Sequence, residues 1–131
     1  MAQWLFDYYE ILEHMDYLEQ ELGESKRELK RWVDGDLQGV KLTAESRSSG
    51  LEKNIKFLED ELVHQQEKLA GLLYIVKGFE DAESQVIFKK YVERKTLERA
   101  AEELDYSFGH VKRVHAKVAK RIRVYEAELF D

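Results

Sequence analysis

Residues 96–118 read TLERAAEELDYSFGHVKRVHAKV, and this stretch predicts two helices separated by a tight break. Thr96 is a suitable N-cap for a short helix that ends at Leu104. The next three residues form the break, and the serine at its end can cap a second, basic helix over residues 108–125. The stretch therefore predicts a helix, a turn and a second helix in direct succession.

Small and apolar side chains occupy the positions where these two helices would touch. Ala101 lies at the expected crossing, with Ala100 beside it. In the basic helix, apolar residues recur at steps of three and four: Val111, Val114, Val118 and Ile122. A further short helix, capped by Asp81 and running through Tyr91, precedes the pair. Three helices, of which the middle one is short and the last one basic, predict a helix-turn-helix DNA-binding module over residues 80–131.

The basic helix presents a polar and cationic face away from its apolar stripe, where arginine and lysine can reach guanine acceptors in the major groove. The candidate base contacts on this face are Phe108, His110, Lys112, Arg113 and Lys117. The candidate phosphate contacts, which position a module without specifying sequence, are Thr96, Ser107, Lys120, Arg121 and Arg123. A solvated helix end would also explain the last three cations, because Lys and Arg favour helix C-termini.

Two residues depart from the pattern expected of such a module. Asp105 stands where many helix-turn-helix turns have glycine, and aspartate adopts the left-handed conformation less readily. Gly109 lies inside the basic helix, where it lowers helix propensity by about 1 kcal/mol relative to alanine. Either Gly109 allows close approach to a DNA backbone, or it is simply tolerated.

The charge of the chain is divided unevenly along its length. Residues 1–80 contain 17 acidic and 10 basic residues, whereas residues 81–131 contain 10 acidic and 11 basic ones. Residues 107–124 contain six cations and no acid. Because a local cluster of cations governs phosphate binding, the net charge of -6 does not exclude DNA as a partner.

Apolar residues at alternating steps of three and four predict two long helices in the first 79 residues. The first series is Trp4, Tyr8, Ile11, Met15, Leu18, Leu22, Leu29 and Trp32, interrupted by Ser25. The second series is Leu51, Ile55, Leu58, Leu62, Leu69, Leu72, Val76 and Phe79, interrupted by Gln65. Glycines and serines between them predict a loop near 34–50. The predicted fold class is therefore all-α: an acidic, coiled-coil-like helical hairpin over residues 1–79, followed by the helix-turn-helix module over 80–131.

The two apolar seams can pair in more than one way. They can form an antiparallel hairpin within one chain, associate between chains as a homodimer, or do both in a four-helix dimer. A monomer could instead offer its seam to another protein. The first 24 residues contain seven acids and no Lys or Arg, which we interpret mainly as a solvated helix face.

Other kinds of chemistry find little support in the sequence. The four histidines lack metal-ligand spacing, the chain has no cysteine, and its scattered glycines form no phosphate-binding loop. We therefore expect no catalytic residues, no metal and no cofactor, and we interpret His115 as partly packed. Neither a secretion signal nor a membrane-spanning stretch is visible, so we expect a cytoplasmic protein that does not bind a membrane.

Three segments carry a resemblance to a known class of proteins: ESQVIFKKY (83–91), TLERAAEEL (96–104) and YSFGHVKRVH (106–115). Together they resemble region four of bacterial sigma factors. They are more closely similar to phage and prophage transcription regulators of the ArpU and RinA type, which also place a Glu/Lys-rich helical segment before such a module. The resemblance covers residues 81–124, and over 1–80 it extends only to architecture. It implies a late-gene activator in the bacterial host cytoplasm, with double-stranded DNA as partner, and it leaves direct contact with RNA polymerase open.

Two other functions fit the same residues. A phage DNA-packaging protein, such as a small terminase subunit, also combines a helix-turn-helix with helical oligomerisation segments, and would form a closed ring. A helical adaptor would bind a protein through its acidic hairpin and would show no salt-sensitive binding to DNA.

Overall fold

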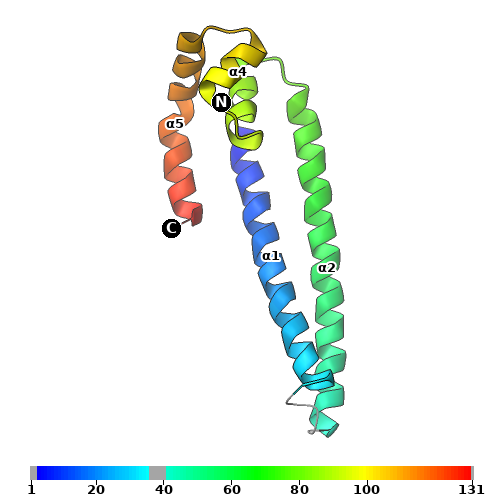
Figure 1. Ribbon diagram of the computed structural model, residues 1–131. Helices are drawn as coiled ribbons and strands as arrows, with labels where there is room; N and C mark the ends of the chain where they lie inside the picture. Colours follow the sequence, from blue (N-terminus) through cyan, green and yellow to red (C-terminus); the bar gives the residue numbers. More distant parts are fainter. Residues whose placement is uncertain (1–2, 36–40, 131) are drawn as a thin grey trace. The chain divides into compact units, whose positions relative to one another are not determined.

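The computed structural model describes residues 3–35 and 41–130, apart from the side chains of 41–46, 121, 122 and 124–130. Along the chain the elements are α1 (Gln3–Val33), α2 (Lys41–Lys77), α3 (Ala82–Ile87), the π-helical turn η1 (Phe88–Val92), α4 (Leu97–Leu104) and α5 (Phe108–Phe130) (Figure 1). These described residues include no strand. The predicted all-α fold class is therefore confirmed.

The chain divides into two compact units, and the division differs from the predicted one at residues 79 and 80. One unit, here called the hairpin unit, is Ile11–Lys68. The other, called the C-terminal unit, combines Met1–Glu10 with Leu69–Asp131. The first turns of α1 and the last turns of α2 thus belong with the C-terminal helices, for reasons of packing given below.

In the hairpin unit, α1 and α2 pack against each other through the predicted seam. Ile11 and Leu18 of α1 are buried, as are Ile55 and Leu58 of α2. Ser25, which interrupts the first apolar series, is also buried, and its hydroxyl oxygen accepts a hydrogen bond of 3.1 Å from the amide of Asn54. This partner from the facing helix offsets the cost of burying a hydroxyl group.

The predicted loop near 34–50 is wrong from residue 41 onward, because α2 already begins at Lys41. Residues 36–40 lie outside the described part of the chain. Serine and glycine each lower helix propensity by 1 kcal/mol or less, and the segment has no proline. Extending a helix that already exists is easier than nucleating one, so a long, well-packed α2 can continue through such residues.

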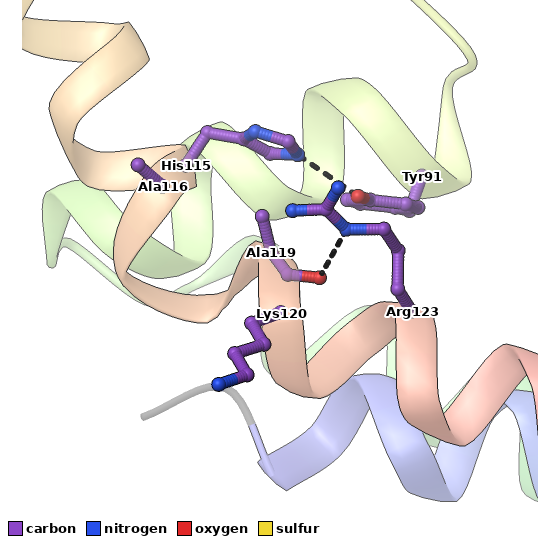
Figure 2. Close-up of a pocket in the computed structure, with 6 residues that line it drawn as sticks. All are labelled: Tyr91, His115, Ala116, Ala119, Lys120 and Arg123. Atoms are coloured by element: carbon purple, nitrogen blue, oxygen red, sulfur yellow. Dashed lines mark hydrogen bonds between the residues drawn. The ribbon is translucent and has the colours of Figure 1, made fainter.

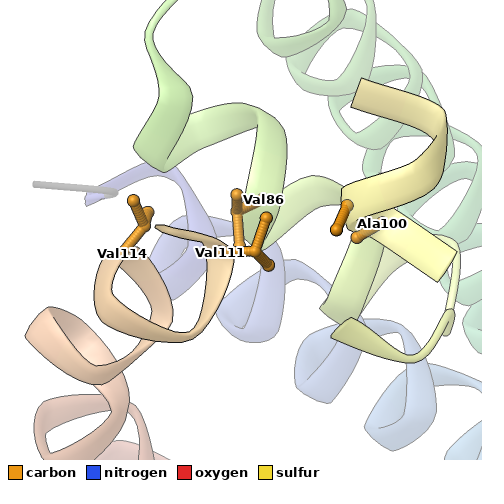
Figure 3. Close-up of a cluster of buried hydrophobic side chains, with 5 residues drawn as sticks. Val86, Ala100, Val111 and Val114 are labelled. Carbon is orange, nitrogen blue, oxygen red and sulfur yellow. The ribbon is translucent and has the colours of Figure 1, made fainter. Parts of the chain in front are cut away.

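The core of the C-terminal unit lies where α3, α4 and α5 meet. Val86, Ala100, Ala101, Val111 and Val114 form a buried cluster (Figure 3). Leu97, Leu104 and Tyr106 pack against it and are partly buried. The two alanines expected at the helix crossing are therefore in the core, as is the apolar stripe of α5 up to Val118.

The first turns of α1 pack against α3 and η1 in the same unit. Trp4, Leu5, Phe6 and Tyr9 are all buried. The indole N–H of Trp4 donates to the Ser84 hydroxyl at 3.3 Å, and its ring lies 6.2 Å from that of Phe88. Trp4 was expected in the hairpin seam, so that placement is corrected. The contact joins residues 80 positions apart, which helical periodicity cannot reveal.

The hairpin seam offers a matched pair of neighbouring residues for a stability test. Leu58 is 6% exposed and Phe57 is 59% exposed. We expect Leu58→Lys to lower the free energy of unfolding by at least about 2 kcal/mol, because it removes packing and buries a charge. Phe57→Lys should change it by less than about 0.5 kcal/mol. Urea unfolding followed by circular dichroism measures both, and equal losses would contradict the seam.

The place of Trp4 in the C-terminal unit can be tested in the same way. Trp4→Ala should cost about 3–5 kcal/mol of unfolding free energy, since it empties a buried aromatic site and leaves Ser84 without its donor. Trp32, at the other end of α1, is only half-buried, so Trp32→Ala should cost less. If Trp32→Ala proved the more damaging of the two, the assignment of Trp4 to this core would be wrong.

Candidate nucleic-acid interface

The turn between α4 and α5 is built from local hydrogen bonds at both helix ends. The Thr96 hydroxyl caps α4 by accepting from the backbone N–H of Arg99 at 3.1 Å. At the other end, Asp105 adopts the left-handed conformation with φ 59° and ψ 40°. There the N–H of Tyr106 donates to the carbonyl of Ala101 at 3.0 Å, which ends the helix. The aspartate thus occupies the conformation for which glycine was expected.

The start of α5 is held from two sides. The Ser107 hydroxyl accepts from the backbone N–H of His110 at 3.1 Å, so serine caps the helix as the sequence predicts. The Tyr106 hydroxyl donates to the Gln85 side-chain oxygen at 3.1 Å and thereby connects the turn to α3. The Tyr106 ring also meets the His110 ring edge-on at 5.0 Å. His110 is half-buried and is therefore less exposed than Phe108 and Lys112.

The first three turns of α5 carry an exposed cationic face. Lys112, Arg113 and Lys117 are exposed, and in the part of the chain that the structure describes none of them forms an ion pair. The Lys112 ammonium lies 5.2 Å from the centre of the Phe108 ring, whose side chain is 42% exposed. Four of the five candidate base contacts are thus exposed on α5.

Gly109 lies under the Arg113 side chain on this surface. A Cβ atom built at Gly109 would be 3.4 Å from an Arg113 guanidinium nitrogen, which is an ordinary contact with the end of a flexible side chain. Its backbone does not have a positive φ. The fold therefore does not require glycine at this position.

The second half of α5 borders a cavity of about 420 Å³ (Figure 2). Its lining residues are Tyr91, His115, Ala116, Ala119, Lys120 and Arg123. The Arg123 side chain donates to the Ala119 carbonyl at 3.3 Å, while Lys120 is exposed. Two candidate phosphate contacts, Lys120 and Arg123, thus lie at one cavity. The third cation among the candidate phosphate contacts is Arg121, whose side chain lies outside the described residues.

A tyrosine–histidine pair forms one wall of this cavity. The Tyr91 hydroxyl oxygen lies 2.8 Å from His115 Nε2, and the two rings stack at 5.7 Å. Burial lowers the pKa of His115, and the nearby positive charges of Lys90 and Arg123 lower it further. The ring is therefore neutral at neutral pH, and in the tautomer that carries its proton on Nδ1, Nε2 accepts the Tyr91 hydroxyl hydrogen. The sequence indicated packing of His115, but it gave no sign of Tyr91 as the partner.

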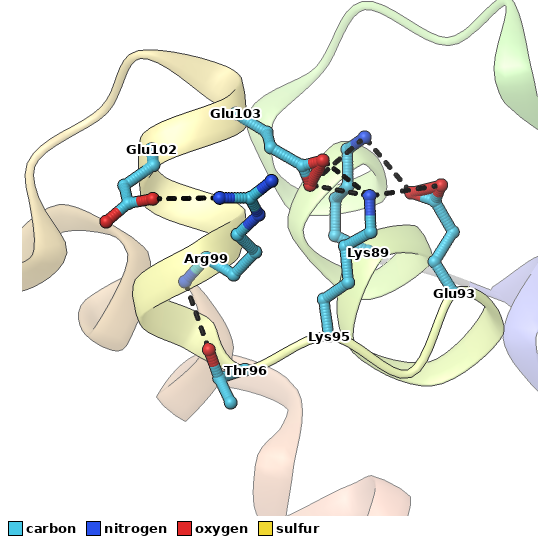
Figure 4. A network of polar contacts seen from close by, with 7 residues as sticks. All are labelled: Lys89, Glu93, Lys95, Thr96, Arg99, Glu102 and Glu103. Atoms are coloured by element: carbon cyan, nitrogen blue, oxygen red, sulfur yellow. Dashed lines mark hydrogen bonds and ion pairs between the residues drawn. The ribbon is translucent and has the colours of Figure 1, made fainter.

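A network of ion pairs connects η1 to α4, and its cations are Lys89 and Lys95 (Figure 4). Lys95 donates to Glu103 at 2.6 Å, and Lys89 contacts Glu93 at 3.0 Å. The hydrogen bond between Lys95 and Glu103 raises the pKa of the lysine and lowers that of the glutamate. These lysines are already neutralised by carboxylates, so they contribute little attraction for phosphate.

The remaining candidate phosphate contacts, Thr96 and Ser107, are the two helix caps. Each hydroxyl oxygen accepts a backbone hydrogen bond, which leaves its hydrogen as the group that could donate to a phosphate. Within the described residues, no group of three or more His, Asp or Glu side chains could hold a metal ion. No helix among them is long and apolar enough to cross a membrane.

Comparison with known proteins adds no relative to this chain. No family model, curated protein or solved structure matches this chain significantly. The resemblance to the ArpU and RinA regulators therefore stays a prediction, which rests on the segments within residues 83–115 quoted above.

Proposed function

We propose that the chain is a sequence-specific DNA-binding transcription regulator that inserts the first turns of α5 into the major groove. The observation that carries this proposal is the cationic face of Lys112, Arg113 and Lys117 directly after a capped turn. Arginine and lysine at the start of such a helix can reach the guanine acceptors O6 and N7. Because these cations have no carboxylate partner among the described residues, binding DNA would not first require breaking an ion pair.

Phosphate contacts in this proposal flank the groove-facing turns. Lys120 and Arg123 supply positive charge further along α5, while the caps Thr96 and Ser107 can each donate one hydroxyl hydrogen. Such contacts fix the register of a module on the duplex without reading its sequence.

The biological role follows from the resemblance rather than from the geometry. Similarity to the ArpU and RinA regulators makes a phage or prophage late-gene activator, acting in the host cytoplasm, the role we propose. Double-stranded DNA is then the partner of α5. RNA polymerase and a second copy of the chain, joined through the hairpin unit, are further partners that this role would use.

Specific and nonspecific contacts can be separated by two alanine variants. Arg113→Ala should weaken binding to the preferred sequence by about 1–3 kcal/mol and relax base preference, since it removes a base contact. Lys120→Ala should weaken binding to all sequences similarly and reduce the logarithmic salt slope by about 1. Binding of a selected duplex and a random duplex is measured between 50 and 200 mM salt by fluorescence anisotropy.

Lys56→Ala in the hairpin unit provides the control, because Lys56 is exposed and paired with Asp60. Equal loss on both duplexes for Arg113→Ala would contradict the assignment of the base-reading face. If the wild type bound no duplex even at low salt, the whole proposal would fail and the adaptor alternative would replace it.

Gly109 provides a test in which stability and binding should move in opposite directions. Gly109→Ala should raise the free energy of unfolding by up to about 1 kcal/mol, because a Cβ fits there and alanine favours the helix. If α5 lies close to the DNA backbone at this position, the same variant should lose DNA affinity. Thermal unfolding and anisotropy measure the two effects. Unchanged affinity would show that Gly109 is only tolerated.

A further inference from the structure

A second cavity, of about 280 Å³, lies within the C-terminal unit on residues outside the candidate base-reading face. Its lining residues are Tyr9, Lys90, Tyr91, Arg94 and Lys95. Three of the five are cations, two are tyrosines, and no carboxylate is among them. The cavity is therefore a positively charged hollow with aromatic walls.

The three cations differ in how far their charge is already compensated. Lys95 is held by Glu103 at 2.6 Å and lies 3.7 Å from a Glu93 oxygen. Lys90 and Arg94, by contrast, form no ion pair with any other residue that the structure describes. Two uncompensated cations on one cavity repel each other, and an anion between them would remove that repulsion.

The backbone at this cavity is irregular in two ways. The turn η1 has π-helical geometry, in which the N–H of Glu93 donates to the carbonyl of Phe88 at 3.1 Å, and such turns are frequent at functional sites. Arg94, which follows it, has a φ of 57° in the left-handed region. Glycine is the usual residue after a helix end in this conformation. The chain instead has an arginine there, and this residue lines the cavity.

Left-handed geometry alone does not distinguish Arg94, because Asp105 shares it. Aspartate is, however, one of the few residues whose short polar side chain visits that region routinely. An arginine has no such local compensation. Strained residues of this kind cluster at ligand clamps, and here the strain coincides with a cavity and a second unpaired cation.

We propose that this cavity binds a phosphate group, held by Lys90 and Arg94 and flanked by the rings of Tyr9 and Tyr91. Arginine presents a planar fork of donors that matches phosphate oxygens, and lysine adds a compact charge. The aromatic walls suit a phosphate that carries a sugar or base. The phosphate belongs either to a free phosphorylated compound or to a DNA backbone. The site does not depend on the proposed base-reading role of α5, since its residues come from α1, η1 and the segment after η1.

The test uses the full chain and inorganic pyrophosphate as the probe. Isothermal titration calorimetry should detect binding to the wild type, and Arg94→Gly and Lys90→Gln should each weaken it about tenfold or more. Arg94→Gly removes the guanidinium while relieving the left-handed strain, so the fold should be retained. Asp105→Gly is the matched control: it places glycine at the other left-handed position and leaves the cavity cations intact, so pyrophosphate affinity should not fall.

A parallel titration with a DNA duplex identifies the source of the phosphate. If pyrophosphate binds and both cavity variants keep wild-type affinity for the duplex, the ligand is a free phosphorylated compound. If both variants lose about tenfold on the duplex, as compared with Asp105→Gly, the cavity holds a backbone phosphate. If the wild type does not bind pyrophosphate and the duplex affinity is the same in all variants, the proposal is overturned. The pyrophosphate result stands whether or not α5 reads DNA.

Discussion

The close packing of α4 on α5 is the constraint on which the cationic face of α5 depends. Ala100 and Ala101 are 0% and 4% exposed, and each contributes only a methyl group to the contact. Larger side chains there would push the two helices apart. Burial of Val111 and Val114 fixes the rotation of α5 about its own axis, so the charged residues near them must point outward.

The cations of the C-terminal unit fall into two groups with different physical roles. Lys89, Lys95 and Arg99 are paired with carboxylates and connect or stabilise helices. Those on the first turns of α5, together with Lys90 and Arg94, have no such partner among the described residues. A count of basic residues in the sequence therefore overstates the charge that is available to an anion. Only the pattern of ion pairs separates the cations that are held by carboxylates from those that are not.

Features with local causes could be predicted from the sequence. The seams of α1 and α2 follow from apolar spacing, and the caps Thr96 and Ser107 follow from residue type at helix starts. Features that depend on distant contacts could not. The pairing of Trp4 with Ser84 needs two segments that no periodicity relates.

The candidate nucleic-acid interface, like the fold, could be predicted only in part from the sequence. Outward cations on α5 follow from its apolar stripe, because a helix with one buried face exposes the other. The cavities do not follow, since both are lined by Tyr91, whose position depends on the geometry of η1. Nothing in the letters FKKYV indicates π-helical rather than α-helical hydrogen bonding. The left-handed conformation of Arg94 could not be predicted either, because arginine is not a residue that indicates a turn.

The discontinuous C-terminal unit has a consequence for the order of folding. The hydrogen bond between Ser25 and Asn54 joins α1 to α2 inside the hairpin unit, which extends from Ile11 to Lys68. Once the hairpin unit has formed, its two ends are held together, and the remaining loop between Trp4 and Ser84 is effectively short. The entropic cost of closing that loop is then smaller, because this cost grows with the number of free residues in the loop. Pairing of α1 with α2 thus lowers the entropic cost of bringing Trp4 to Ser84, which favours an order of folding in which the hairpin unit forms before the core of the C-terminal unit.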